Sequence, residues 1–550
     1  MIRSLLLIGL VVSLVVAACG GDGEAIVFTS TTDESRSTAT TAGIEAYPDR
    51  IVREYLSGCA AEADEGMCRC TIGEFQQRIT LSEFVELIDI DLEASPVVQD
   101  VLELCRARGF ADTTTTTVGA DSTSTSEPGS VSITDVETIT DIESITELTI
   151  TDLQQWWSVE LPAVFGTAYE PVSEFGPYFP SQGDAPTCGG PLEREEFEAN
   201  AFYCSVDNTV QWDAETLMAP LFQEFGDFTV ALVLAHEWGH AVQAQFGFDD
   251  FTQPTIVSEL QADCLAGSWT GRVSRDESDL VRLRAGDLEE AMAGFLLIGD
   301  EIGTAPLGVD AHGGSFDRLN AFFEGFNEGT AECATYEDSP PDIVFIPLLV
   351  STDPNVNLLD LPLADSAPRF IEALEAFWTI FYPEIFGAPW VPVSEAIPLR
   401  PSSGTFPTCN DVTLEPSFYE GNAFYCPADD YVAWDEERLF PNLYFEIGDF
   451  AIGLVLANEW GRAVQSRAGL PIDTAAAQLQ VDCLTGVWTA VLIPDDNPTT
   501  IRLSAGDLEE VIASILTLSD APGEKGAVSA FDRFESFKDG FFLGTDVCDL

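Results

Sequence analysis

The chain contains two long segments that carry the same motifs in the same order, at residues 150–336 and 367–550. The string NAFYC is found in both segments, and so is the string AGDLEE. Two longer strings of the first segment recur in closely similar form in the second, GDFTVALVLAHEWGHAVQ and LQADCLAGSW. A repeat this long, with a full set of motifs in each copy, indicates an internal duplication that gives two whole domains rather than short stacked units.

In the first copy, the sequence predicts a mostly buried helix around ALVLAHEWGHAVQ. Asp227 is placed to cap its start, a strongly apolar run follows, and Gly247 is a stop signal. His236 and His240 are four residues apart and therefore lie on one face of the helix, where both imidazoles can bind one metal ion. Glu237 projects beside them.

A second predicted helix, SELQADCLAGSW, carries Glu259 and Asp263, which are also four residues apart. A catalytic zinc takes three protein ligands and keeps a fourth position for water, so we interpret Glu259 as the third ligand. Asp263 is placed to accept the second ring N–H of a ligating histidine, which fixes its tautomer. The alternatives are a chance HExxH in a helix that buries two histidines, and Glu259 as a solvated helix residue.

These motifs resemble those of the bacterial putative neutral zinc metallopeptidases, whose pattern includes an AHExGHxxQ helix and an ELQADCxAG helix. The chain has AHEWGHAVQ at 235–243 and ELQADCLAG at 259–267, with NAFYC before them and HGGSFDR after them. The resemblance covers roughly residues 153–333. It implies a gluzincin-like fold with an E-x-x-x-D helix that supplies the third zinc ligand, and peptidase activity. Substrates do not carry over.

The chemistry that we expect is metal-assisted hydrolysis of a peptide or protein substrate. Zn²⁺ lowers the pKa of its bound water and polarises the scissile carbonyl, while Glu237 takes the water proton and passes it to the leaving amine. His312, in HGGSFDR, is a candidate donor to the oxyanion, and a purely structural role is equally consistent with its position. Two other functions stay open: a lipid-anchored binding protein with a structural zinc, and a metal-dependent amidase that acts on cell-wall peptides.

The N-terminal segment, residues 1–18, has the features of a lipoprotein signal peptide, and VAAC places Cys19 as the lipidated residue. An ordinary secretory signal followed by a stray cysteine is the alternative. No other stretch is long and apolar enough for a membrane helix. We therefore expect the protein at the extracytoplasmic face of the cell membrane, held by its lipid anchor only.

Further segments are predicted from composition. Glycine, serine, threonine and acidic residues indicate flexible chain, and four cysteines beside a helical pattern indicate a small cross-linked module. The predicted segments are a tether at 19–45, a four-cysteine helical module at 46–110, a Ser/Thr/acid-rich linker at 111–149, and a linker between the copies at 337–366.

The other cysteines follow the repeat, four to a copy, which in an oxidising compartment indicates disulfides. We favour pairing Cys188 with Cys204 and Cys264 with Cys333, although the sequence does not fix the connectivity. The aligned residues of the second copy are Cys409, Cys426, Cys483 and Cys548.

Charge and composition complete the prediction. The chain has 93 acidic and 23 basic residues, a formal charge of −70, which excludes binding to nucleic acid or to anionic membranes and keeps the chain soluble and monomeric. The fold class that we expect is mainly α, with α+β as the alternative because a small sheet can form around NAFYC. Two tandem zincin-like metallopeptidase domains would follow a small disulfide-rich helical module.

The second copy lacks the predicted ligands. Asn458, Arg462 and Gln478 align with His236, His240 and Glu259, and none of the three replacements is a good zinc ligand. Glu459 and Asp482 are retained. We predict an inactive domain that keeps the fold, in which the Arg462 guanidinium takes the zinc position and pairs with Glu459, Asp482 or both. Neutral drift, the alternative, predicts no such pairing.

Overall fold

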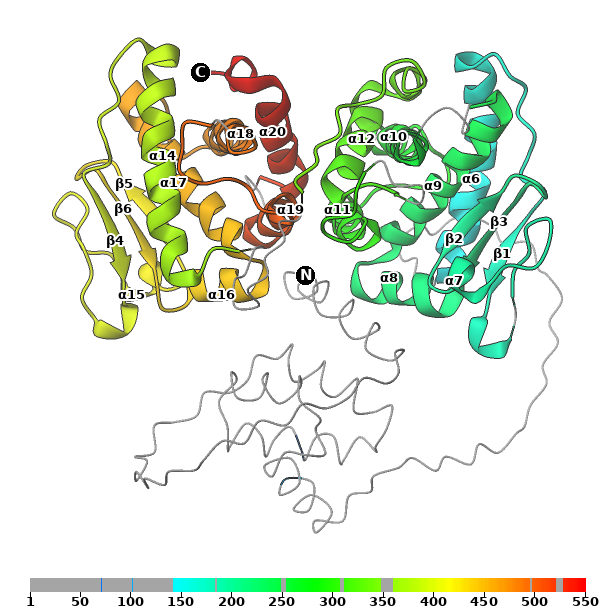
Figure 1. The fold of residues 1–550 in the computed structure, drawn as a ribbon, viewed down its shortest axis with the longest axis horizontal. Helices are drawn as coiled ribbons and strands as arrows, with labels where there is room; N and C mark the ends of the chain where they lie inside the picture. Colours follow the sequence, from blue (N-terminus) through cyan, green and yellow to red (C-terminus); the bar gives the residue numbers. More distant parts are fainter. Residues whose placement is uncertain are drawn as a thin grey trace, which may run out of the picture. The chain divides into compact units, whose positions relative to one another are not determined.

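Figure 1 shows a computed structural model of the chain. Residues 135–550 belong to one compact unit, and residues 19–134 belong to another. The predicted signal peptide, Cys19, the tether and nearly all of the four-cysteine module lie outside the described residues. The structure describes residues 142–183, 185–248, 254–306, 311–347, 360–494, 497–520 and 528–550, together with Thr71 and Val101. Within these ranges no helix has both the length and the apolar character that a bilayer span requires.

The first half, residues 142–347, consists mainly of helices, with a small sheet at the side that faces away from the second half (Figure 1). Its longer helices are α6 (Ile142–Val164), α9 (Asp227–Phe246), α10 (Thr255–Ser274), α11 (Asp287–Ile298) and α12 (Ser315–Glu328). Its strands are β1 (Glu174–Tyr178), β2 (Ala201–Cys204) and β3 (Thr209–Asp213). The short helical segments are η4 (Pro180–Gln182), α7 (Arg194–Phe197), the π-helical turn η5 (Ala214–Met218), α8 (Ala219–Glu224) and α13 (Thr330–Cys333).

The second half, residues 360–550, has nearly the same order of elements. Its longer helices are α14 (Leu363–Phe386), α16 (Leu439–Glu446), α17 (Asp449–Ala468), α18 (Ala475–Val491), α19 (Asp507–Leu518) and α20 (Ala530–Leu543). Its strands are β4 (Glu395–Leu399), β5 (Ala423–Cys426) and β6 (Tyr431–Asp435). Its short segments are η6 (Pro401–Ser403), α15 (Pro416–Tyr419) and η7 (Gly544–Val547).

Each half has a three-stranded mixed sheet with the same topology. The orders are β1-β3-β2 and β4-β6-β5, and in each sheet the first strand pairs in parallel and the last pairs antiparallel with the central strand. The antiparallel pair forms a hairpin whose turn contains a residue with positive φ, Asn208 (52°) or Asp430 (55°), residue types that tolerate this conformation. The prediction of a mainly helical chain with a small sheet at NAFYC is confirmed.

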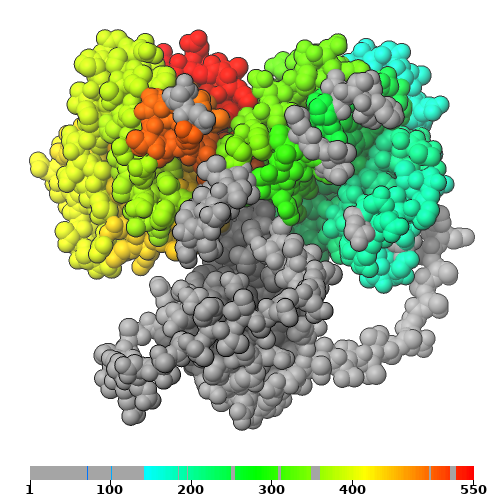
Figure 2. Space-filling view, in the orientation of Figure 1, coloured from blue at the N-terminus to red at the C-terminus, as the bar shows by residue number. Residues whose placement is uncertain are grey.

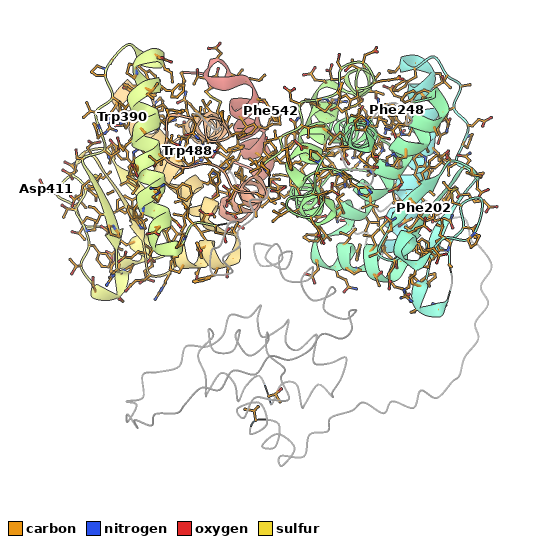
Figure 3. The ribbon with its side chains drawn as sticks, in the orientation of Figure 1. Phe202, Phe248, Trp390, Asp411, Trp488 and Phe542 are labelled. Atoms are coloured by element: carbon orange, nitrogen blue, oxygen red, sulfur yellow. A yellow bond between two sulfur atoms is a disulfide. The ribbon has the colours of Figure 1, made fainter. Side chains whose placement is uncertain are left out.

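Helices α9 and α17 each lie at the centre of a half, since nearly all of their side chains are buried and neither helix has a broad exposed face. Aromatic stacking fixes each of them to the next long helix in an equivalent way. Phe228 stacks on Trp269 with 6.2 Å between ring centroids, and Phe450 stacks on Trp488 with 5.6 Å. Figure 3 shows Trp488 in the interior of the second half, where it is 1% exposed.

Four disulfides have the predicted pairing. Cys188–Cys204 ties the segment before α7 to β2, and Cys264–Cys333 ties α10 to α13. Cys409–Cys426 and Cys483–Cys548 are their counterparts in the second half. The second bridge in each half therefore links the helix after the central one to the end of that half.

Three predicted boundaries differ from the structure. Helix α6 begins at Ile142, inside the predicted linker at 111–149, because Ile145 and Ile150 pack into the core. Helix α14 begins at Leu363, inside the predicted linker at 337–366. The cap of α9 is Gly226, with φ 117°, and not Asp227, which is already in the first turn. The predicted stop at Gly247 is confirmed, since this residue is the left-handed C-cap.

The two halves contact each other through aromatic side chains of α12 and α20. Phe316 lies with its ring centroid 5.8 Å from Phe534 and 5.0 Å from Phe541, and Phe323 stacks on Phe531 at 4.1 Å. Figure 2 shows the green surface of the first half against the orange and red surface of the second.

Candidate metal centre

Helices α9 and α10 approach each other closely enough to bring side chains of both to one point. A Cβ atom at Gly239, which lies between the two histidines in HEWGH, would be 2.9 Å from the Cα of Ala262 on α10. Only glycine allows this approach, because any side chain would push α10 away. The sequence HEWGH therefore supplies both the imidazoles and the space that lets Glu259 reach them.

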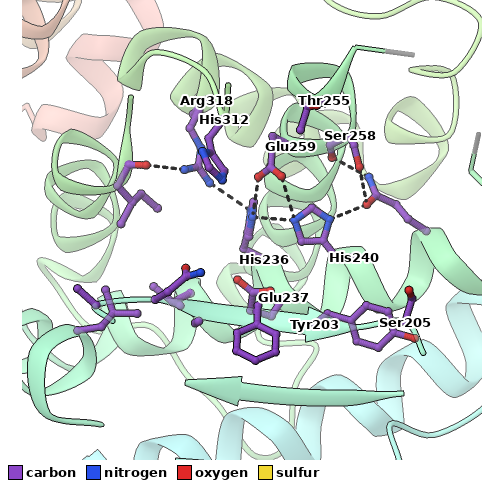
Figure 4. A pocket seen from close by; sticks show the side chains of 18 of the residues that line it. Tyr203, Ser205, His236, Glu237, His240, Thr255, Ser258, Glu259, His312 and Arg318 are labelled. Atoms are coloured by element: carbon purple, nitrogen blue, oxygen red, sulfur yellow. Dashed lines mark hydrogen bonds and ion pairs between the residues drawn. The ribbon is translucent and has the colours of Figure 1, made fainter. Parts of the chain in front are cut away.

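His236, His240 and Glu259 converge at this point, as Figure 4 shows. The two Nε2 atoms of the histidines are 3.1 Å apart. Glu259 Oε2 is 3.3 Å from His236 Nε2, and Glu259 Oε1 is 3.6 Å from His240 Nε2. His236 and Glu259 are buried, and the side chain of His240 is partly open to the adjoining cavity.

The donor set fits zinc. Nitrogen and oxygen ligands at zinc distances in a tetrahedral arrangement lie about 3.3 Å from each other, which is close to the three distances observed here. Burial lowers the pKa of His236, but the charge and hydrogen bond of Asp263, with Glu259, outweigh burial and raise it to about 10. The surrounding carboxylates thus favour positive charge at the imidazoles, and a divalent cation can supply that charge in place of protons.

Asp263 lies behind His236, as predicted for a residue that orients a ligand. Its Oδ1 is 2.7 Å from His236 Nδ1, a hydrogen bond that leaves Nε2 free to face the metal. Arg318 of α12 then binds the same carboxylate with two donors, Nε to Oδ2 at 2.8 Å and Nη2 to Oδ1 at 2.9 Å. Arg318 is 4% exposed, so this is a buried, bidentate pair.

His240 has a different partner on its far side. Its Nδ1 is 2.8 Å from Gln243 Oε1, and the Gln243 amide donates in turn to Ser258 O at 2.7 Å and to Gln261 Oε1 at 3.0 Å. These donations fix the amide orientation, so its oxygen accepts from His240. The spacing of the motifs does not predict a role for Gln243 or Arg318. Both residues lie in strings that the two copies share, AVQ and FDR, and this repetition is the feature of the sequence that could have pointed to them.

A cavity of about 690 Å³ opens beside the three donors. Glu237 lines it, next to His236 in Figure 4, and is buried. Strand β2 borders the cavity with Phe202 and Tyr203, and β2 is an edge of its sheet. The site therefore combines a candidate base, a candidate metal-binding set and an edge strand along one cavity.

Comparison with known proteins agrees with this geometry. Residues 195–336 match the family described as putative neutral zinc metallopeptidase. The matched segment contains the two histidines, Glu237, Glu259, Asp263 and Arg318. Zinc is the cofactor that the description of this family names, and the donor set agrees with it.

Two curated relatives, both named as uncharacterized proteins, match part of the chain. The uncharacterized protein YpfJ of Escherichia coli K12 is 32% identical over 160 residues, which cover 25% of this chain and 54% of YpfJ. The uncharacterized protein Rv2575 of Mycobacterium tuberculosis is 31% identical over 163 residues, 25% of this chain and 56% of that protein. The chain thus spans about half the length of the curated relatives it matches. No solved structure matches it.

His312 lies at the rim of the same cavity. Its backbone N–H donates to Asp300 Oδ2 at 2.9 Å, and its Nδ1 is 3.5 Å from Asp300 Oδ1. The hydrogen bond with Asp300 raises the pKa of His312 despite partial burial. More than half of the side chain is exposed, so it borders the cavity without touching the predicted ligands.

The corresponding place in the second half holds a hydrogen-bonded network. The Gln478 amide donates to Asn458 Oδ1 at 2.9 Å and to both oxygens of Asp482 at 3.1 Å. Arg533, the counterpart of Arg318, binds Asp482 through Nε at 2.8 Å and Nη2 at 2.9 Å. A buried arginine–aspartate pair therefore lies behind the ligand position in both halves.

The prediction that Arg462 pairs with Glu459, Asp482 or both is confirmed for Glu459. Arg462 Nε is 3.5 Å from Glu459 Oε1, and its Nη2 donates to the side-chain oxygen of Gln478. It does not pair with Asp482, because Arg533 and Gln478 already occupy that carboxylate. Burial raises the pKa of Glu459 to about 7 although Arg462 opposes this shift.

Proposed function

We propose that the first half is a zinc metallopeptidase that hydrolyses peptide bonds at the candidate metal centre. The observation that carries this proposal is the convergence of His236, His240 and Glu259 to within 3.6 Å of one another beside Glu237 and an open cavity. A purely structural zinc is normally enclosed by four protein ligands, whereas here the donors face a cavity. The arrangement thus leaves room for water and substrate.

When bound, zinc supplies Lewis-acid polarisation of the scissile carbonyl and acidifies water at the site. Glu237 acts as the base that accepts the proton of the attacking water and returns it to the leaving amine. Asp263 holds His236 in the tautomer with a free Nε2, and Gln243 does the same for His240. His312 reaches the cavity from its rim as a donor for the developing oxyanion.

The substrate class follows from the border of the cavity. Strand β2 is an edge strand, so one side of it presents backbone N–H and C=O groups that pair with no strand in the described part of the chain. An extended peptide can bind to such an edge by adding a strand to the sheet. Phe202 and Tyr203 offer apolar contacts to alternate side chains of that peptide. A peptide or an unfolded protein segment is therefore the substrate that this site suits.

In this proposal the second half is inactive and serves as a scaffold or cover. Asn458 and Gln478 hydrogen-bond to each other where the first half has ligands, and Arg462 carries a permanent positive charge there. Cys19 anchors the chain to the extracytoplasmic face of the membrane, and the enzyme works as a monomer. The anchor is inferred from the sequence of residues 1–19.

Glu237→Gln tests the proposal directly, because it removes the base and leaves the ligands. The purified full chain should bind one zinc ion, and the variant should keep that zinc while peptide hydrolysis falls by about 10²- to 10⁴-fold. His240→Ala and Glu259→Ala should lose the zinc itself. The matched control is Glu459→Gln in the second half, which should leave both zinc content and hydrolysis unchanged.

Metal analysis and a peptide-library cleavage assay read out the two properties separately. Hydrolysis that persists in Glu237→Gln would refute its role as base. Full zinc content in Glu259→Ala would remove Glu259 from the centre, and zinc in an amount of two per chain would contradict an inactive second half.

A further inference from the structure

Outside the metal centre, each half contains a buried group of carboxylates where the starts of two helices meet. In the first half, Asp227 at the start of α9 faces Asp287 and Glu290 at the start of α11. Ligand oxygens of these three residues lie within 4.8 Å of one another. We call this group the first acidic cluster.

The second half repeats the arrangement with one added member. Asp449 lies at the start of α17, and Glu510 lies in the first turn of α19. Carboxylate oxygens of these two residues and of Asp360 all lie within 4.8 Å of one another. Asp507 is next to them, and the charges of Asp449 and Asp360, after burial, hold its pKa well above its ordinary range. We call Asp360, Asp449, Asp507 and Glu510 the second acidic cluster.

The backbone around the second acidic cluster is shaped to admit Glu510. A Cβ atom at Gly448, where φ is 149°, would lie 2.0 Å from Glu510 Oε1. The Phe450 N–H donates to Glu510 Oε2 at 2.8 Å. Glycine at 448 is therefore needed for Glu510 to reach the start of α17, and the carboxylates are gathered by the fold rather than by a mobile surface.

The first acidic cluster contains its own cation. Arg284 donates through Nη2 to Asp227 Oδ1, and its Nε is 3.7 Å from Asp287 Oδ1. In the second half the aligned residue is Ser504, within RLSAGDLEE as against RLRAGDLEE. Ser504 donates to Asp507 through its backbone N–H at 2.8 Å and its hydroxyl at 2.6 Å, but it brings no charge.

In the second acidic cluster, one carboxylate oxygen of Asp449 has no hydrogen-bond partner among the described residues. Asp449 is 3% exposed, and its Oδ1 is a buried acceptor that no donor among the described residues reaches. A buried, unpartnered carboxylate oxygen is costly unless a proton or a cation binds to it. Burial and the charge of Asp360 raise the pKa of Asp449 to about 7.

We propose that the second acidic cluster is a binding site for a hard divalent cation, Ca²⁺ or Mg²⁺, which takes the place that the Arg284 guanidinium fills in the first half. The ion would bridge the starts of α17 and α19 to Asp360, just before α14, and so fasten three elements of the second half. This site is separate from the zinc centre and does not depend on its activity.

The donor chemistry selects the kind of ion. The three side chains whose ligand oxygens lie within 4.8 Å of one another, Asp360, Asp449 and Glu510, all offer carboxylate oxygens, which hard cations prefer, and the group contains no histidine or cysteine. Oxygens that are up to 4.8 Å apart can share an ion to which each binds at about 2.4 Å, a distance typical of Ca²⁺. Mg²⁺ binds at about 2.0–2.1 Å and would require the cluster to contract. We therefore expect Ca²⁺ to bind more tightly.

The test measures calcium binding and thermal unfolding of the full chain, at fixed zinc and in buffer freed of calcium. Because the chain carries a formal charge of −70, ionic strength is held constant with NaCl so that diffuse binding does not contribute. Calorimetric titration should show one saturable Ca²⁺ site per chain. At 100 times its dissociation constant, Ca²⁺ should raise the Tm by roughly 5 to 10 °C.

Ser504→Arg is the informative variant, since it installs the cation of the first half. It should raise the calcium-free Tm and abolish the saturable site. Arg284→Ser is the matched control, and it should create a second calcium response in the first half. Asp449→Asn combined with Glu510→Gln provides an independent variant that removes ligand charge without adding a side chain, and it should also lose the site.

The outcomes separate clearly. A wild-type chain with no saturable site for either ion would overturn the proposal, and so would an identical calcium response in the wild type and in both second-half variants. A response to Mg²⁺ that exceeds the response to Ca²⁺ would support a hard-cation site and assign it to the smaller ion.

Discussion

Arg318→Met tests whether a buried guanidinium positions the first zinc ligand. In the structure Arg318 donates twice to Asp263 and once to Ile298 O at 2.7 Å, and Asp263 contacts His236 at 2.7 Å. Methionine is similar in length and apolar, so it keeps much of the packing while it removes the charge and all the hydrogen bonds. Asp263 would then be a buried carboxylate with His236 as its one remaining charged partner.

Two losses of different kind should follow. Removing one partner of a buried ion pair costs about 3–5 kcal/mol of unfolding free energy, and we expect the lower end because His236 stays beside Asp263. Zinc affinity should fall by about 10- to 100-fold, the usual effect of losing a residue that orients a ligand. Urea unfolding measures the first loss, and competition with a chelating dye measures the second.

Arg533→Met is the matched control, because Arg533 binds Asp482 with the same two donors and distances of 2.8 and 2.9 Å. It should destabilise the second half by a similar amount and leave zinc affinity unchanged. The reasoning fails if Arg318→Met binds zinc as tightly as the wild type. It also fails if both variants weaken zinc binding equally, since the effect would then be one of general destabilisation.

Three further predictions concern other parts of the chain. Replacing Cys264 and Cys333 by alanine opens a bridge that spans 69 residues, and should lower the unfolding free energy by about 4 kcal/mol in a chemical denaturation experiment. Cys19→Ser should release the protein from the membrane fraction on cell fractionation, whereas unchanged membrane association would refute the anchor. Burial raises the pKa of Asp317 to about 7, so the folded protein favours the protonated carboxyl group. The contribution of this group to the unfolding free energy is therefore complete below pH 4 and is lost as the pH rises through 7. Asp317→Asn should flatten that part of the plot of unfolding free energy against pH.

Much of the metal centre was predictable because its residues are paired along helices. The spacing of His236 and His240 and that of Glu259 and Asp263 fixes which side chains share a face, whatever the helices pack against. The disulfides could be predicted because equal numbers of cysteines recur in both copies. The sheet was predicted only in outline, since the parallel partner of β3 comes from a segment, EFGPY, without a clear strand pattern.

The parts that were not predicted depend on contacts between distant elements. Arg318 is on α12, 55 residues beyond Asp263, and no local periodicity links the two. The same holds in the second half, where Asp482, one of the two acids considered for Arg462, is bound instead by Arg533 of α20. Spacing along one helix correctly placed Arg462 near Glu459, but it could not show that the other acid already had a partner.

The Arg–Asp pair explains how the second half can lose the metal ligands and keep the fold. It is present in both halves, so its contribution to helix packing does not depend on zinc, and in the first half the zinc centre is built in front of it. The absence of the metal ligands has a limited cost in stability. Among the described residues, the buried oxygens Glu459 Oε2 and Gln465 Oε1 have no hydrogen-bond donor. Gln465 aligns with Gln243, whose oxygen accepts from His240, and the change to Arg462 redirects the donor toward Gln478 and Ile472 O. The fold of the second half therefore does not require the ion, and the proposed zinc centre differs from its counterpart there at three side chains, His236, His240 and Glu259.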